Sequence, residues 1–301
     1  MGSVFSRPFY TLTAVTTTLI ATLVGLVYNY QGYLVYPSNF PPDCRKYVDT
    51  PDKYGIPFKD VELTTSDGEK LKAFVMLQDQ NWQFYVPKTI LVFCPNAGNM
   101  GHFLPLIQIM YQQMGYNVVI FSYRGYGKST GTASEQGIKL DCEAVADYLY
   151  ADEQIKQTSL IVYGRSIGGA IGIYFSTLAK ARDLVKGIIL ENTFLSIPKL
   201  LPHAFPVLAP FSFLCTERWE TEKIIGDINS TVPILFLGGK QDELVPNSHM
   251  KQLFEMSKSE RKTIKEFEKG THNDTVVQPS YWDFFYEFCR TDVEPLQYKN
   301  E

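Results

Sequence analysis

A serine flanked by glycines stands where an apolar run gives way to a helical pattern. Ser166 is the centre of Gly164–Gly168, a G-x-S-x-G sequence that follows the apolar run 160–163 and precedes the segment 170–175. The glycines allow neighbouring chains to approach a sharply turned serine whose Oγ is exposed, and the helix amino terminus favours developing negative charge. The pattern predicts a nucleophilic serine; a helix-capping serine in a tight turn is the alternative interpretation.

A serine hydroxyl is a weak nucleophile at neutral pH, so it requires a nearby base and an acid that orients that base. His272 and Asp242 each follow a run typical of a strand. Both are therefore expected at the carboxyl edge of a parallel sheet, where such sheets place their sites. Along the chain the serine comes first, then the aspartate and then the histidine, which is the order that accompanies a nucleophilic serine in a strand-to-helix turn. We predict a triad of Ser166, Asp242 and His272, and we keep Glu191, which ends another expected strand, as a weaker candidate for the acid.

The same chemistry needs two backbone N–H groups that stabilise an oxyanion. Ile167 directly follows the serine and is expected to supply the first donor. The second is expected from the loop 94–99, in which Pro95 has no N–H, so Asn96 is the favoured donor. A plain strand-to-helix turn is the alternative interpretation of this loop.

These residues require elements that bring several strand ends together. Two alternating runs, 61–64 and 71–75, flank a turn and predict an opening β-hairpin. Further strands are expected at 89–93, 117–121, 159–163, 186–190 and 232–237. Helices are expected at 103–114, 135–150, 168–181, 248–256 and 280–289. This alternation predicts an α/β fold with a mostly parallel central sheet and flanking helices.

A stretch rich in proline and apolar residues interrupts the alternation at about 194–226, and we interpret it as a small cap inserted over the sheet. Its apolar side chains either belong to an ordinary core or form an acyl-binding surface that faces a membrane. These side chains are Phe205, Val207, Leu208, Phe211, Phe213 and Leu214.

The amino-terminal segment carries no charged side chain between Pro8 and Pro42. Residues 9–30 are long enough to span a bilayer, although threonines lower their hydropathy, and tyrosines follow like an interfacial belt. We predict a single-pass membrane anchor; a signal peptide and a buried helix are the alternatives. The flanking positive charges nearly balance, so the orientation stays open. The first residues also fit the myristoylation pattern, with Gly2 as the acceptor.

The chain is expected to divide into five segments with different roles. They are a tail 1–8, the anchor 9–30, a linker 31–57, an α/β domain 58–291 that contains the cap, and a tail 292–301. Because the linker is rich in proline, we do not expect it to be a packed element. Deletion of residues 1–36 is accordingly expected to release an active soluble domain.

Composition excludes several classes of protein. The chain has 301 residues with 28 Lys and Arg against 32 Asp and Glu, so no basic surface supports nucleic-acid binding. An apolar content of 45% with 20% charged residues is not that of a disordered chain. The five cysteines are scattered without a C-x-x-C pair, which indicates neither a zinc site nor a disulfide scaffold.

Two glycosylation sequons begin at Asn229 and Asn273. A glycan on Asn273 would stand beside His272 and block the expected cleft, so this sequon is discounted.

From about residue 58 to 289 the chain resembles the α/β-hydrolases. More narrowly, it resembles the membrane-anchored serine hydrolases related to α/β-hydrolase domain-containing protein thirteen. The sequences that carry the resemblance, besides the anchor, are N-A-G-N-M-G-H at 96–102, S-Y-R-G-Y-G-K-S at 122–129, G-R-S-I-G-G at 164–169, E-N-T-F at 191–194, Q-D-E-L-V-P at 241–246 and G-T-H-N-D at 270–274.

The resemblance implies a serine hydrolase with the triad Ser166, Asp242 and His272 and with no cofactor or metal. The expected substrate is an ester or thioester, of the lipid or acyl-protein type. A serine peptidase of the same fold and a membrane-tethered scaffold without activity are the alternatives. The expected location is the endoplasmic reticulum or another endomembrane, with the mitochondrial membrane as the alternative. The chain departs from the family at Cys94-Pro95, where the family usually has His-Gly, and this departure bears on the donor role of Asn96.

Overall fold

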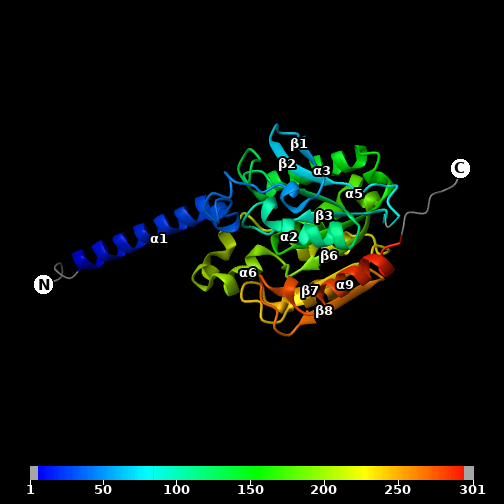
Figure 1. Cartoon of the computed structure of the whole chain (residues 1–301). Helices are drawn as coiled ribbons and strands as arrows, with labels where there is room; N and C mark the ends of the chain where they lie inside the picture. Colours follow the sequence, from blue (N-terminus) through cyan, green and yellow to red (C-terminus); the bar gives the residue numbers. More distant parts are fainter. Residues whose placement is uncertain (1–5, 84, 295–301) are drawn as a thin grey trace.

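The computed structural model describes residues 6–83 and 85–294. Eight strands in these residues form one sheet with the order β1-β2-β4-β3-β5-β6-β7-β8 (Figure 1). The strands are β1 Lys59–Thr64, β2 Lys70–Met76, β3 Lys88–Phe93, β4 Asn117–Phe121, β5 Ser159–Arg165, β6 Val185–Glu191, β7 Ile234–Gly239 and β8 Lys262–Phe267. β2 is antiparallel to both of its neighbours, whereas β4, β3 and β5 to β8 are parallel. The predicted α/β fold with a mostly parallel sheet is confirmed.

Helices connect these strands, as the alternation predicted. The α-helices are α1 Ser6–Val35, α2 Leu104–Gln108, α3 Glu135–Ala151, α4 Ile167–Thr177, α5 Ala179–Leu184, α6 Ile197–Ala204, α7 Thr221–Ile224, α8 Asn247–Met256 and α9 Tyr281–Glu287. Three expected helices are not uniform α-helices. The segment 280–289 passes from α9 into a π-type turn at Phe288–Asp292. The segment 103–114 is divided into a 3-10 turn, α2 and a π-type turn. The segment 168–181 breaks at the extended Leu178, where the hydroxyls of Ser176 and Thr177 donate to preceding carbonyls and disturb the helix.

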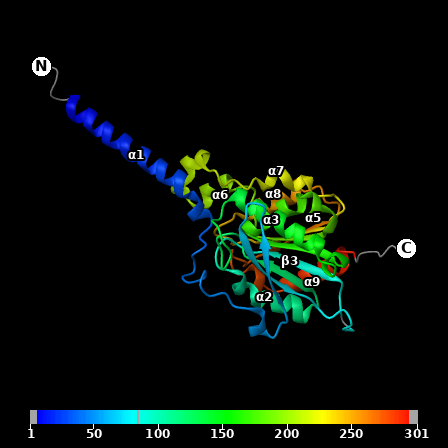
Figure 2. The same cartoon turned by 90° about the horizontal axis from the view of Figure 1, so that it is seen from above.

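The sheet is covered on both faces. Figure 2 shows α3, α5 and α8 on one side of it and α2 and α9 on the other. Every residue of β3, β4 and β5 is therefore buried, and Leu91 of β3 lies in register with Val119 of β4 and Val162 of β5. Burial on both faces is why these strands read as continuous apolar runs in the sequence.

A buried arginine ties the opening hairpin to the helical layer. Arg124 donates to Asp141 of α3 at 2.7 Å and to Asp67, in the turn between β1 and β2, at 2.7 and 3.0 Å. The guanidinium fork satisfies two carboxylates at once, and Asp141 has no exposed surface. The S-Y-R-G-Y-G-K-S sequence thus has a structural role in this fold.

The amino-terminal helix α1 extends away from the sheet, and its carboxyl-terminal end lies beside the cap (Figure 1). It continues to Val35, beyond the expected anchor 9–30. By length and hydropathy, no single helix among the described residues qualifies as a membrane span. The segments Thr13–Leu26 and Tyr28–Val35, with a 43° bend between them, qualify only as a pair. Gly2 lies outside the described residues.

The end of α1 is fastened to the cap, which comprises α6, the 3-10 helix η5 (Pro206–Leu214) and α7. Gln31 donates to the carbonyl of Leu214 and accepts from the backbone of Thr216. Tyr36 donates to Glu217 and accepts from Trp219, both at 2.7 Å. Burial raises the pKa of the Tyr36 hydroxyl well above its ordinary value, so the hydroxyl remains a donor. We call Gln31, Tyr36, Glu217 and Trp219 the α1–cap latch.

Residues 31–57 are therefore not an unpacked linker, and this expectation is wrong. Beyond the latch, Asn99 donates to the carbonyls of Cys44 and Tyr47, and the backbone of Gly98 donates to Phe40. Cys44 is buried. The sequence suggested a linker because its prolines prevent regular elements, but an irregular segment packs equally well when the loop beneath it supplies the missing hydrogen bonds.

Candidate active site

Ser166 occupies a sharp turn between β5 and α4. Its backbone φ of 55° and ψ of −124° form a conformation that residues other than glycine rarely adopt. The chains around it are closely packed: a Cβ on Gly164 would lie 2.4 Å from the Gly168 carbonyl, and one on Gly168 would lie 2.1 Å from the carbonyl of Phe93. Only glycine fits at both positions, which is the steric origin of the G-x-S-x-G sequence.

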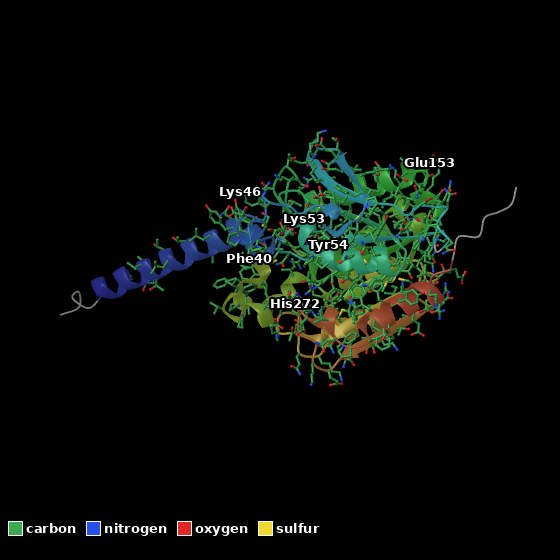
Figure 3. The ribbon with its side chains drawn as sticks, in the orientation of Figure 1. Phe40, Lys46, Lys53, Tyr54, Glu153 and His272 are labelled. Carbon is green, nitrogen blue, oxygen red and sulfur yellow. The ribbon has the colours of Figure 1, made fainter. Side chains whose placement is uncertain are left out.

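The structure brings together the three side chains predicted to act as a unit. The Ser166 hydroxyl lies 3.0 Å from Nε2 of His272, and Nδ1 of His272 lies 2.8 Å from Oδ2 of Asp242. The other oxygen of Asp242 accepts from the backbone of Leu244 and Val245, which fixes the carboxylate plane. All three side chains are buried, and they follow β5, β7 and β8 at one edge of the sheet. Figure 3 shows His272 at the end of the sheet nearest the cap.

The two residues predicted to supply the oxyanion donors lie at the cavity that contains Ser166. Ile167 and Asn96 both line this cavity, and neither N–H is used in a hydrogen bond within the described part of the chain. Asn96 is held by two contacts, because its carbonyl accepts from Tyr126 at 2.7 Å and its side chain donates to the carbonyl of Val35 at 3.3 Å. Ile167 also begins α4, where the helix dipole favours negative charge.

The cavity above Ser166 has a volume of about 810 Å³, counted to its open mouth, and is almost entirely apolar. Its polar side chains are Gln31, Asn96 and Ser166, together with the thiol of Cys215. Its apolar lining residues are Leu34, Val35, Ile167, Phe194, Ile197, Leu200, Leu201, Phe205, Leu208, Phe211 and Leu214. The end of α1 and the cap therefore form much of its wall. An apolar lining with a few polar groups is typical of pockets that hold small organic ligands.

Glu191, the weaker candidate for the acid, has different partners. Its carboxylate accepts from the hydroxyls of Tyr163 at 2.5 Å and Tyr281 at 2.6 Å. Burial raises the pKa of both tyrosines well above their ordinary values, so both remain donors. The other carboxylate oxygen lies 3.4 Å from Nε of Arg165. The structure thus pairs His272 with Asp242 and places Glu191 in a buried cluster behind them.

Positioning residues beside the three central side chains were not identified from the sequence. Asn192 donates to the carbonyl of His272 and accepts from the backbone of Gly239, so it connects the end of β7 to the loop after β8. Arg165 donates to the same His272 carbonyl at 2.9 Å. The E-N-T-F and G-R-S-I-G-G sequences contain these residues, but only the tertiary structure shows what they contact.

The two glycosylation sequons and the absence of a predicted metal site concern the surface of the described residues and not the triad. Asn229 and Asn273 are both exposed, and the side chain of Asn273 also accepts a hydrogen bond from Arg165 at 3.1 Å. Among the residues that the structure describes, no group of three or more His, Cys, Asp or Glu side chains is placed to hold a metal ion.

A family model described as serine aminopeptidase, S33, matches residues 87–228. An uncharacterized membrane protein of Saccharomyces cerevisiae is 46% identical over 277 residues, which cover 92% of this chain and 93% of that protein. The α/β-hydrolase domain-containing protein WAV2 of Arabidopsis thaliana is 35% identical over 90% of this chain and 91% of its own length.

A structure of the Pyrococcus furiosus esterase Pf2001 has the same fold, with a TM-score of 0.68. It is 21% identical, and the match covers 83% of this chain and 97% of that one. Fold and relatives together define a hydrolase class of protein. The chain belongs to the α/β-hydrolase superfamily, as its motifs predicted.

Proposed function

We propose that this protein is a membrane-anchored serine hydrolase that cleaves an ester or thioester through Ser166, His272 and Asp242. The observation that carries the proposal is the continuous hydrogen-bonded path from the Ser166 hydroxyl through His272 to Asp242. This path ends in an apolar cavity that is also lined by Asn96 and Ile167, whose backbone N–H groups have no acceptor among the described residues. The proposed substrates are lipids or acylated proteins, because an acyl group matches an apolar wall.

The proposed reaction has two steps. In the first, Oγ of Ser166 attacks the acyl carbonyl carbon while its proton moves to Nε2 of His272, and Asp242 stabilises the imidazolium. The N–H groups of Ile167 and Asn96 stabilise the oxyanion, and the alcohol or thiol leaves with the proton from His272. In the second step, water loses a proton to His272 and attacks the acyl carbon. Oγ of Ser166 then leaves with the proton from His272, which releases the carboxylic acid and restores the free enzyme.

A serine peptidase is the second candidate, favoured by the description of the matching family model. An aminopeptidase must bind the ammonium group of its substrate, for which a carboxylate is the usual partner. Among the residues that the structure describes, those lining the cavity above Ser166 include no Asp or Glu. The cavity therefore supports an ester or thioester over a peptide with a free amino terminus.

Membrane attachment through α1 is also part of the proposal. Two features of the helix support it: the absence of charged side chains from Pro8 to its end at Val35, and the exposure of large apolar side chains such as Val15, Leu19 and Leu26. The relative in Saccharomyces cerevisiae is named a membrane protein. An endomembrane location, with the endoplasmic reticulum first, remains the prediction drawn from the resemblance.

Labelling with a fluorophosphonate probe tests the proposed hydrolase activity. We expect the full-length protein in detergent to form a covalent adduct on Ser166, identified by peptide mass spectrometry, because His272 activates this hydroxyl. It should also hydrolyse p-nitrophenyl butyrate. A folded protein that neither reacts with the probe nor cleaves the ester would contradict the proposed function and favour the scaffold.

Two truncations of α1 test the proposed anchor. They differ in whether Gln31 and Tyr36 of the α1–cap latch are kept or deleted. Deletion of residues 1–28 should release the protein from membranes in carbonate and leave butyrate hydrolysis within about threefold, since Gln31 to Tyr36 remain. Deletion of residues 1–36 also removes Gln31 and Tyr36. Loss of such a buried aromatic typically costs ~3–5 kcal/mol, so this variant should lose at least tenfold in activity and melt at a lower temperature. Carbonate extraction, thermal melting and the ester assay decide the outcome. Membrane retention of the shorter deletion, or equal behaviour of the two, would contradict this interpretation of α1.

A further inference from the structure

The cavity above Ser166 has a buried end and an exposed end, which the exposed fractions of its lining residues distinguish. At its inner end lie Ser166, Ile167 and Phe194, all buried. At its outer end lie Leu34 of α1 and Phe205 of the cap, which are 50% and 47% exposed. The mouth of the cavity therefore opens between the last turn of α1 and the cap.

The side chains along this path suit a hydrocarbon chain. Between the buried and the exposed ends, the wall consists of aliphatic and aromatic residues from α6 and η5. The polar side chains of the lining are already hydrogen-bonded within the protein. Gln31 bonds to the backbone of Leu214 and Thr216, and the Asn96 side chain bonds to the carbonyl of Val35. An acyl chain laid along this path would place its carbonyl at Ser166 and its methyl end towards α1.

The surroundings of the mouth indicate where such a chain comes from. Val207 and Phe213 of η5 are 85% and 75% exposed, and they belong to the same cap that α1 contacts. If α1 is a membrane anchor as proposed, these exposed side chains of the cap lie close to the point where the helix leaves the bilayer. Exposed apolar side chains beside a membrane helix are stable when they contact the lipid interface.

We propose that the last turn of α1 and the cap together form a binding channel for a long acyl chain, which enters from the membrane beside the helix. Leu34 on one wall and Leu208 on the other are the specificity-determining residues for chain length. This inference rests on the proposed hydrolase function and narrows its substrate to long-chain acyl esters or thioesters. The amino-terminal helix is then a part of the substrate site as well as an anchor.

A chain-length series on the full-length protein in one detergent tests the channel. The readout is the ratio of kcat/KM for p-nitrophenyl decanoate to that for p-nitrophenyl butyrate. Because each buried methylene favours binding about fourfold, we expect this ratio to exceed tenfold in the parent protein. Leu34→Trp should lower the ratio at least tenfold by filling the channel, and Leu208→Trp should do the same from the opposite wall.

Leu26→Trp is the matched control, since Leu26 is a leucine of α1 with 52% exposure that does not line the cavity. It should keep the parent ratio. Thermal melting of all variants identifies any that fail to fold, and two filling variants on separate elements guard against that failure. The inference is overturned if the parent does not prefer decanoate, or if both filling variants keep the ratio of the Leu26 control. In either case butyrate hydrolysis and probe labelling still report on the proposed function, so the two failures are distinguishable.

Discussion

Replacing Ser166 with alanine is expected to lower kcat/KM for p-nitrophenyl butyrate by at least ~10³-fold and to abolish fluorophosphonate labelling. Removal of the nucleophile from a working triad costs several orders of magnitude in rate. The fold should survive, because the substitution removes only the hydroxyl that pairs with His272, and the Cβ of alanine occupies the same position as that of serine. Turnover within tenfold of the parent protein would place the nucleophile elsewhere.

The backbone of Ser166 offers an internal control for this experiment. With φ at 55°, alanine keeps the strain that serine carries, whereas glycine adopts this conformation freely. Such strain costs ~1–3 kcal/mol, so Ser166→Gly should melt a few degrees above Ser166→Ala while being equally inactive. Equal melting temperatures would show that the strain relieved is no larger than the entropic cost of glycine, about 0.5–1 kcal/mol. A difference in stability without a difference in activity separates the chemical role of the hydroxyl from the structure of the turn.

The sheet and the three central side chains were readable from the sequence because their signals are local. Strands buried on both faces give apolar runs, and the turn at Ser166 needs glycines within two residues of it. Asp242 and His272 were found by their positions just after such runs. The structure places both within hydrogen-bonding reach of the expected partner.

What the sequence did not show depends on contacts between distant segments. Tyr36 and Glu217 lie 181 positions apart, and no periodic pattern marks either as a partner of the other. The same holds for Asn192, whose contacts with Gly239 and His272 exist only after three strands have been placed side by side. The proline-rich segment after α1 misled for a related reason, because irregular backbone has no period but still packs.

Asp242→Asn is expected to lower kcat/KM by ~10⁴-fold, the loss seen when the triad aspartate of a serine protease is replaced. The hydrogen bonds of Asp242 explain why the loss should be so large. Its Oδ1 accepts from the backbone of Leu244 and Val245, so the amide oxygen of the asparagine stays there. The amide NH₂ group then faces Nδ1 of His272, which must accept instead of donate. The proton of the neutral imidazole moves to Nε2, and His272 can no longer take the proton of Ser166.

Glu191→Gln is the matched comparison, since it is the same change of a buried carboxylate to an amide. The side-chain oxygen of the glutamine can still accept from Tyr163 and Tyr281, and the pair with Arg165 is weakened. Arg165 acts on His272 only through the backbone carbonyl, so we expect a loss in kcat/KM within about tenfold, accompanied by a lower melting temperature. Steady-state kinetics and thermal melting of the two variants measure both effects. If Glu191→Gln proved the more severe in turnover while remaining folded, the acid would belong to β6 and the role assigned to Asp242 would be wrong. Because both variants remove one negative charge from a buried site, their difference reports the tautomer of His272 and not the local charge alone.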